Sequence, residues 1–429
     1  MEKIIKKIIL IVSLLVSCHS VFPQKDDDKL IIEGFIEGDH ISYFNKFSDS
    51  TIDVRNQSTL QIKLSKKLSE RTGFFSSTEF REDFSDEDRS RVFGEEYYFN
   101  FTKKKWDFKL GKQRIYWGRA DGINFSNNIN PSDYSDFLDV EDEELGVLAG
   151  NIKYNFKNNF FFQTIILPAY RTSRLPSQQS VWQYNLPTSV EIMGTTLPAI
   201  YQFSEDFIPD VDGGIQYAFK LDGSLNSIDL SLGFYSGFSD LPELVINPTN
   251  VASNNVTLTV QKVYIPWNVI SFDFATYFKS IGFRGEFGYF ITKGRGAELA
   301  DSEENYLQYS LGLDYLLPIG NTNLLLLAEW MHEWVPSGRK YSTSSLNHIF
   351  QKSLLVRTEL KVRDKLSMAF QAIYDFKNTD YYLQPKVTYA VIDDVLVSLL
   401  SDIIGANGEG VLGLYERNDR TQLKITYNF

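Results

Sequence analysis

The chain has 429 residues, of which 43% are hydrophobic and 15% aromatic, and its formal net charge is −12. This charge argues against nucleic acid as a partner, because phosphate binding needs clustered Lys and Arg. A single Cys excludes a disulfide framework within the chain. The length suits two ordinary domains or one large all-β barrel.

The first 24 residues have the features of an export signal. MEKIIKK supplies a positively charged start, and IILIVSLLVS is an apolar run shorter than the roughly 20 residues of a membrane-spanning helix. We expect cleavage between Ser17 and Gln24, and one domain over residues 25–429. The motif LVSC resembles a bacterial lipobox, so lipidation of Cys18 is the alternative to its loss with the signal.

Past residue 30, apolar and polar residues alternate along much of the chain. In TQLKITYNF, the odd-numbered positions from Thr421 to Phe429 share one mainly apolar face, and the even-numbered positions share a polar face. Such alternation is typical of β-strands with two different faces. The same period of two recurs in residues 215–221, 228–234, 270–274, 281–289 and 366–370.

The connections between these segments alternate in length. Tight turns at 157–159, 279–280, 318–321, 363–364 and 393–394 precede longer loops at 169–210, 293–304, 336–347, 376–381 and 403–418. A soluble sandwich has no reason for this asymmetry, whereas a transmembrane barrel has short turns on one side and long loops on the other. We therefore predict an all-β fold, a transmembrane antiparallel β-barrel of about 18 strands (16–18). VTLTVQKVY at 256–264 is assigned to an outer loop, because a barrel strand there would break the alternation.

Aromatic residues gather near the predicted strand ends, and the chain ends in Phe429 on an amphipathic strand. Aromatic girdles mark both membrane interfaces in such barrels, although a generic aromatic core is the alternative. The location indicated is the bacterial outer membrane, with its lipid and lipopolysaccharide as partners.

The polar faces of the strands line the lumen in this arrangement, because a charge on the lipid face costs about 2–4 kcal/mol near the midplane. The lumen-facing pore candidates carry both signs: Arg284, Glu286, Glu329, Arg357, Glu359 and Lys386. They form either a conduction ladder for a solute or a salt-bridged lattice, and we expect a lattice for most of them. Apolar residues also fall at lumen positions, which leaves partial closure open: Leu325, Leu327, Leu355 and Ile373.

Two long loops stand out by composition. PSDYSDFLDVEDEEL at 131–145 is strongly acidic but lacks the spacing of a calcium-binding EF-hand, so we expect a solvated loop rather than a divalent-cation site or a bridge to lipopolysaccharide. The segment 169–210 is long and irregular in pattern. It either folds inward and narrows the pore or lies over the outer mouth.

Motifs for catalysis are missing from the sequence. There is no HExxH, no Cys/His cluster, no G-x-S-x-G elbow and no nucleotide fingerprint, so we expect no enzyme, no metal and no cofactor. His332 lies near Glu329 and Glu333, and a barrel lipase or protease with such a dyad is one alternative. A closed barrel that acts as an adhesin or assembly partner is the other.

The most specific segment is LGKQRIYWGRADGINFSNNINPSDY, residues 110–134. Gly111 and Gly118 permit a bulge or a close backbone approach, and Asn-Pro at 130–131 starts a turn. We expect the loop to fold into or over the barrel mouth and to set its gate, with a structural latch that makes no solute contact as the alternative. Its pore or gate candidates are Arg114, Trp117, Arg119, Asp121, Asn130 and Asp133, and the two arginines are expected to pair with Asp121, Asp133 or Asp136.

The same block carries a family resemblance. Leu110-Gly-Lys-Gln, Trp117-Gly, Asp121-Gly and Asn130-Pro-x-Asp resemble an uncharacterised porin-like family of Gram-negative outer membranes, and alginate-export-type barrels more distantly. The resemblance implies a monomeric porin-like channel for lipid or other hydrophobic or small organic compounds, working with a periplasmic or inner-membrane transport partner. The chain departs from the family pattern at Lys112, where Arg is usual, and in its more acidic loops.

Overall fold

The computed structural model describes residues 29–45, 53–139, 144–157, 159–177, 180–183, 186–206, 214–292, 305–320, 322–337, 348–349, 351–362, 365–407 and 410–429. The predicted export signal, its cleavage site and Cys18 lie outside the described residues, as do the turn at 363–364 and the loops at 293–304 and 338–347. In the part of the chain that is described, no helix is long and apolar enough to cross a bilayer.

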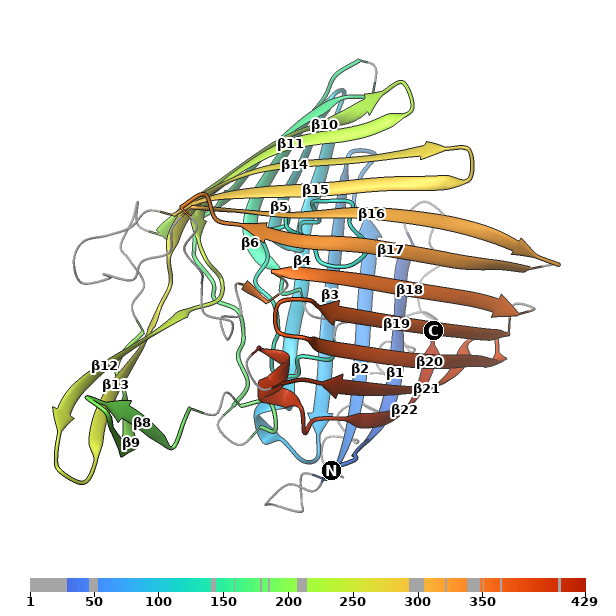
Figure 1. The fold of residues 1–429 in the computed structure, drawn as a ribbon. Helices are drawn as coiled ribbons and strands as arrows, with labels where there is room; N and C mark the ends of the chain where they lie inside the picture. Colours follow the sequence, from blue (N-terminus) through green and yellow to red (C-terminus); the bar gives the residue numbers. More distant parts are fainter. Residues whose placement is uncertain are drawn as a thin grey trace.

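Eighteen strands of the described chain form one closed antiparallel barrel (Figure 1). Each barrel strand pairs with the next along the chain, and β22 returns to β1 with Phe35 opposite Asn428. Closure leaves the barrel wall without a free strand edge. The predicted fold and strand number are confirmed. The strands are β1 (Leu30–Tyr43), β2 (Val54–Lys67), β3 (Thr72–Asp83), β4 (Arg91–Lys103), β5 (Trp106–Gln113), β6 (Val147–Asn155), β7 (Phe161–Leu167), β10 (Gln216–Leu225), β11 (Ile228–Phe238), β14 (Pro266–Phe278), β15 (Ile281–Thr292), β16 (Tyr306–Ile319), β17 (Thr322–Trp334), β18 (Lys352–Val362), β19 (Leu366–Asp375), β20 (Asp380–Ile392), β21 (Val395–Gly405) and β22 (Arg420–Asn428).

Side chains alternate across the barrel wall as the sequence period predicts. On β11, Leu232 on the outer face is 54% exposed, whereas Ser231 on the inner face is 2% exposed. On β22, Leu423 and Ile425 are exposed, and the intervening Lys424 is buried. An apolar exterior around a polar interior is the arrangement of a membrane barrel.

A second, four-stranded sheet lies outside the barrel, at the end that carries the long loops (Figure 1). It consists of β8 (Ser189–Ile192), β9 (Thr195–Phe203), β12 (Glu243–Val251) and β13 (Val256–Val263), and β13 runs parallel to β9. The prediction that 256–264 is not a barrel strand is confirmed. The prediction of an irregular loop over 169–210 is wrong for β8 and β9, because pairing with β13 satisfies their backbone groups and buries Leu197, Val256 and Leu258.

Inward-facing apolar side chains form two buried clusters near the long-loop end. The first contains Ile115 and Trp117 with wall residues such as Ile165 and Val269. The second combines the predicted lumen residues Leu327, Leu355 and Ile373 with two residues from loops, Phe125 and Trp182. The loops therefore pack against the inside of the wall, and the interior is partly filled.

Candidate functional site

The loop between β5 and β6 comprises residues 114–146, and its described part, 114–139 and 144–146, enters the barrel and contacts strands on opposite sides of it. The loop begins after Gln113, whose side chain is 0% exposed and donates to the carbonyl of Ala149 on β6 at 3.0 Å. Trp117 follows, with its indole N–H donating to Gln163 on β7 at 3.1 Å. From here the chain leaves the wall, and buried carboxylates of distant strands bind its backbone.

Glu286 on β15 is the main anchor of the loop tip. It is 0% exposed, and its Oε1 accepts the N–H groups of Arg119 and Ala120, the latter at 2.6 Å. Its Oε2 accepts the N–H of Ser126 at 3.4 Å. Gly118 precedes these donors with a φ of +90°, and a Cβ at that position would collide with Glu286 Oε1. Glycine is therefore required for the close approach.

Further contacts bind the loop tip to β15 again and to three other strands. Glu329 on β17 accepts the N–H of Gly122 at 3.0 Å. Asp121 pairs with Arg284 of β15, whose guanidinium also contacts Asp314 of β16 at 2.7 Å. The Arg119 guanidinium bridges β10 and β14, because it contacts two carboxylates there: Asp222 at 3.0 Å, and Asp273.

The expected ion pairs within the loop are wrong in their partners. Arg114 pairs with Glu95 on β4 at 2.9 Å, and Arg119 pairs with strand carboxylates. The physical reason is the course of the backbone. The loop crosses the barrel interior instead of folding onto itself, so each arginine pairs with a carboxylate on the strand nearest to it. The prediction that the loop folds into the barrel is confirmed by these contacts.

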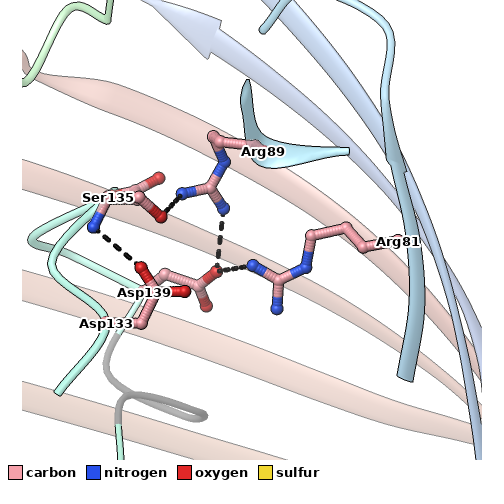
Figure 2. A pocket seen from close by; sticks show the side chains of 6 residues that line it. Arg81, Arg89, Asp133, Ser135 and Asp139 are labelled. Carbon is pink, nitrogen blue, oxygen red and sulfur yellow. Dashed lines mark hydrogen bonds and ion pairs between the residues drawn. The ribbon is translucent and has the colours of Figure 1, made fainter. Parts of the chain in front are cut away.

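The return half of the loop ends in an ionic cluster, part of which is shown in Figure 2. Asp136 contacts Arg55 of β2 at 2.7 Å and Arg420 of β22 at 2.6 Å, and Asp133 contacts Arg91 of β4 at 2.5 Å. Arg89 donates to Ser135 at 2.8 Å. We call this set the arginine–carboxylate lattice. Its members are Arg55, Arg81, Arg89, Arg91, Arg174 and Arg420 with Glu79, Asp83, Asp133, Asp136, Asp139 and Asp402.

The lattice has equal numbers of arginines and carboxylates. The space enclosed by Arg81, Arg89, Asp133, Ser135, Asp136 and Asp139 is too narrow for a water molecule. The expectation of a solvated acidic loop is therefore wrong for Asp133, Asp136 and Asp139, because arginines from other parts of the chain neutralise them. The remaining acidic positions at 141–143 lie outside the described residues. The carboxylates of Asp133, Asp136 and Asp139 therefore form ion pairs inside the barrel, which is the arrangement of a salt-bridged lattice.

The arginines also set the acidity of the buried loop carboxylates. Burial alone would raise the pKa of Asp136, but Arg420, Arg55 and Arg89 outweigh burial and hold the pKa well below its usual value. The pKa of Asp133 is lowered in the same way, with Arg91 the strongest of the opposing charges. Both groups therefore stay ionised at any physiological pH.

Asn130 closes the base of the loop. Its Oδ1 accepts the N–H of Ile115 at 3.1 Å, and its Nδ2 donates to the Ile115 carbonyl at 2.7 Å and to Glu144 at 3.0 Å. Burial raises the pKa of Glu144, although the donors Asn130 and Asn127 oppose the shift. Asn130 thus holds the two ends of the loop together, at the turn that the Asn-Pro pair predicts.

Three predicted pore residues lie apart from the loop. Arg357 and Glu359 on β18 pair with each other at 3.6 Å, and Lys386 lies on β20 opposite Ala369. Arg357 is among the more exposed interior charges, with 41% of its side chain accessible.

The alternative dyad of His332 with a carboxylate of its own strand does not form. Successive residues of β17 face opposite sides of the wall, so Glu329 and Glu333 point inward, while the His332 ring contacts Trp330 and Tyr309 on the outer face. Glu333 instead contacts His348 Nδ1 at 2.5 Å.

Several contributors to the site belong to no motif in the sequence. Arg55, Asp83 and Arg420 fit the polar face of their strands, so alternation alone places them in the lumen. Arg89 comes from a short 3₁₀ helix, Glu87–Arg89, in the loop between β3 and β4. Residues there do not alternate as in a strand, so the sequence does not predict which way the Arg89 side chain points. Their meeting depends on barrel closure, which brings β22 next to β1.

Comparison with known families gives one match that covers most of the chain. The family described as "protein of unknown function (DUF1302)" matches residues 45–392. The chain belongs to the DUF1302 family. This match, together with the porin-like fold, supports the resemblance to an uncharacterised porin-like family, while the likeness to alginate-export-type barrels stays a prediction. Among curated proteins, no significant match was found.

Solved porin structures resemble the DUF1302 chain in fold. OccAB4 of Acinetobacter baumannii has a TM-score of 0.52 at 9% identity, over 94% of this chain and 99% of that one. OccD3 (OpdP) of Pseudomonas aeruginosa has a TM-score of 0.50 at 12% identity, over 95% of each chain. OmpF of Salmonella typhi, solved with daunomycin, has a TM-score of 0.44 at 9% identity, over 95% of this chain and 99% of that one. At these identities the likeness to OccAB4 and OccD3 concerns the fold alone.

Proposed function

We propose that this DUF1302 chain is an outer-membrane channel in which the loop at 114–146 sets the width of the passage. The observation that carries the proposal is the binding of the loop tip inside the barrel by Glu286 and Glu329. A loop that buried carboxylates hold across the lumen narrows the passage without blocking it completely. The apolar exterior, the polar interior and the porin-like fold support placement in the outer membrane.

The lining favours small organic or amphiphilic solutes over inorganic ions. Charges of both signs balance in the lattice, so the interior has no strong preference for one sign. Beside the loop tip, apolar Leu355 of β18 lies opposite Glu329 of β17, and Leu327 lies opposite Asp314 of β16, which is the partner of Arg284. A passage with polar and apolar walls suits a solute that has both kinds of surface, including a lipid. A periplasmic or inner-membrane transport partner belongs to the same proposal.

Solute efflux from vesicles tests this function. Purified protein is reconstituted with solutes of similar size, namely a neutral sugar, a zwitterionic amino acid, an organic anion and an organic cation, and release is timed against protein-free vesicles. We expect protein-dependent release of all four, with anion and cation rates within about tenfold of each other, because the lining is balanced in charge. No release of any solute would contradict a channel, and a much larger preference for one sign would contradict the balanced lining.

A further inference from the structure

Basic residues gather on three neighbouring short turns, although the whole chain is acidic. In the turn regions 66–71, 103–107 and 156–160, the described residues include seven cations and two carboxylates. The cations are Lys66, Lys67, Arg71, Lys103, Lys104, Lys105 and Lys157. These turns join β2 to β3, β4 to β5 and β6 to β7, which are consecutive in the wall, so the cations share one side of the short-turn rim (Figure 1). We call them the basic rim.

The basic rim is not neutralised within the described part of the chain. None of its seven side chains forms an ion pair with a described carboxylate, and all except Lys66 are exposed. Of the two nearby carboxylates, Asp107 is occupied by Thr102 at 2.8 Å and Asn155 at 2.6 Å. Seven cations that lack a carboxylate partner in the described chain attract an external anion.

An outward-facing band of aromatic rings adjoins the basic rim. Lys66 lies opposite Phe74, and Lys103 lies opposite Trp106, whose ring is 4.6 Å from that of Tyr154. Trp106 is 44% exposed on the outer face of the wall. The band continues with Phe99, Phe101, Phe108 and Phe162. Aromatic rings of this kind lie at the level of lipid headgroups, and lysines beside them extend toward the phosphate layer.

We propose that the basic rim and the aromatic band together form a binding patch for anionic phospholipid in the leaflet on the short-turn side. The cations take the phosphodiester, and the rings take the glycerol and the first acyl carbons. A soluble acidic protein would use the cations alone, because the rings face the lipid side of the wall. The patch rests on the membrane placement in the proposed function, but it requires no conduction.

Lipid retention tests the patch. The full chain is placed in nanodiscs with equal amounts of phosphatidylglycerol and phosphatidylcholine, and native mass spectrometry of the released barrel counts the lipids that stay bound. The test variant is K103Q/K104Q/K105Q. The matched control is K279Q/K361Q/K365Q, which removes two lysines from other turns at the same end of the barrel and one, Lys361, from the end of β18 beside such a turn. We expect about fivefold enrichment of phosphatidylglycerol for the wild type and the control, and near-equal retention of the two lipids for the test variant.

Equal enrichment of phosphatidylglycerol in the test variant and the wild type would overturn the proposal. The basic rim would then be better explained as a binding surface for an acidic protein. An equal loss in both variants would also overturn it, because the effect would then follow net charge alone. Heat-modifiable migration in gels confirms that each variant is folded. Conductance of the same samples separates the two proposals: a conducting barrel without lipid preference refutes only the patch, and a non-conducting barrel with that preference refutes only the channel.

Discussion

Replacing Glu286 with Gln should release the loop tip. The carboxylate is fully buried and accepts three backbone N–H groups, two on Oε1 and one on Oε2. An amide keeps one acceptor oxygen but turns an N–H₂ group toward the third donor, at Ser126. The two remaining hydrogen bonds also lose the assistance of a negative charge, which roughly halves their strength.

The expected size of the effect follows from these three bonds. Each of the two hydrogen bonds on Oε1 contributes about 1.5–3 kcal/mol of stabilisation, and this contribution falls to about half. The hydrogen bond to Ser126, which contributes about 0.5–1.5 kcal/mol, is lost. The sum is about 3 kcal/mol against the anchored loop. Because each 1.4 kcal/mol is a factor of ten, the ratio of released to anchored loop rises by about a hundredfold.

Single-channel recording measures that ratio as the fraction of time in the larger-conductance state. The control is Glu191→Gln, an exposed carboxylate on β8 of the outer sheet, far along the chain from the lumen contacts. Glu286→Gln should lengthen the larger-conductance state, and Glu191→Gln should match the wild type. Identical traces for Glu286→Gln, Glu286→Ala and the wild type would refute the reasoning that this carboxylate anchors the loop.

Four further outcomes follow from the structure. Asp136→Asn leaves two buried guanidinium groups with fewer partners and should lower the free energy of unfolding by about 3–5 kcal/mol in urea titrations, whereas the exposed Asp394→Asn should change it little. The pKa of Asp133 and of Asp136 is lowered in the folded barrel. The stability that these two groups contribute is therefore complete above their unfolded pKa of about 4, and it is lost as the pH falls through their lower folded pKa values. The melting temperature should stay level from about pH 8 to 5 and drop below about pH 4. Gly118→Ala forces a side chain to a φ of +90° against the anchoring carboxylate, so the loop should lose about 1–3 kcal/mol of anchoring and current noise should rise. Deletion of 189–203 removes two strands of the outer sheet and should leave the mean conductance unchanged; a changed conductance would place that sheet in the passage.

The fold was predictable because a barrel repeats one signal many times. Alternation in segments such as 421–429 gives the strand faces, and the length of each connection gives the side of the wall. The segment 256–264 shows the limit of the method. Its exclusion from the barrel follows from connection lengths, but its parallel pairing with 199–203 depends on contact between two separate loops, which no local pattern records.

The candidate site was predictable in its loop and only partly in its contacts. Gly118 and Asn130 carry recognisable signals, since a close approach and a turn need those residue types. The partners of Asp136 lie 81 and 284 residues away along the chain, so pairing on the basis of nearness in sequence fails. Its acidic neighbourhood likewise looks solvated until the opposing arginines are placed. The arginines that balance the loop carboxylates come from segments that only barrel closure brings together, so the composition of one loop does not predict the balance of charge.

The most direct test of the loop as the narrow point of a channel is conductance in planar bilayers, with the intact chain and with residues 119–126 replaced by a short Gly-Ser linker. Deleting the segment removes the contacts to Glu286 and Glu329 while keeping Asn130 and the lattice. The account predicts stable ohmic steps for the intact protein and larger steps for the replaced loop. Steps of equal size in the two proteins, or no steps in either, would contradict it.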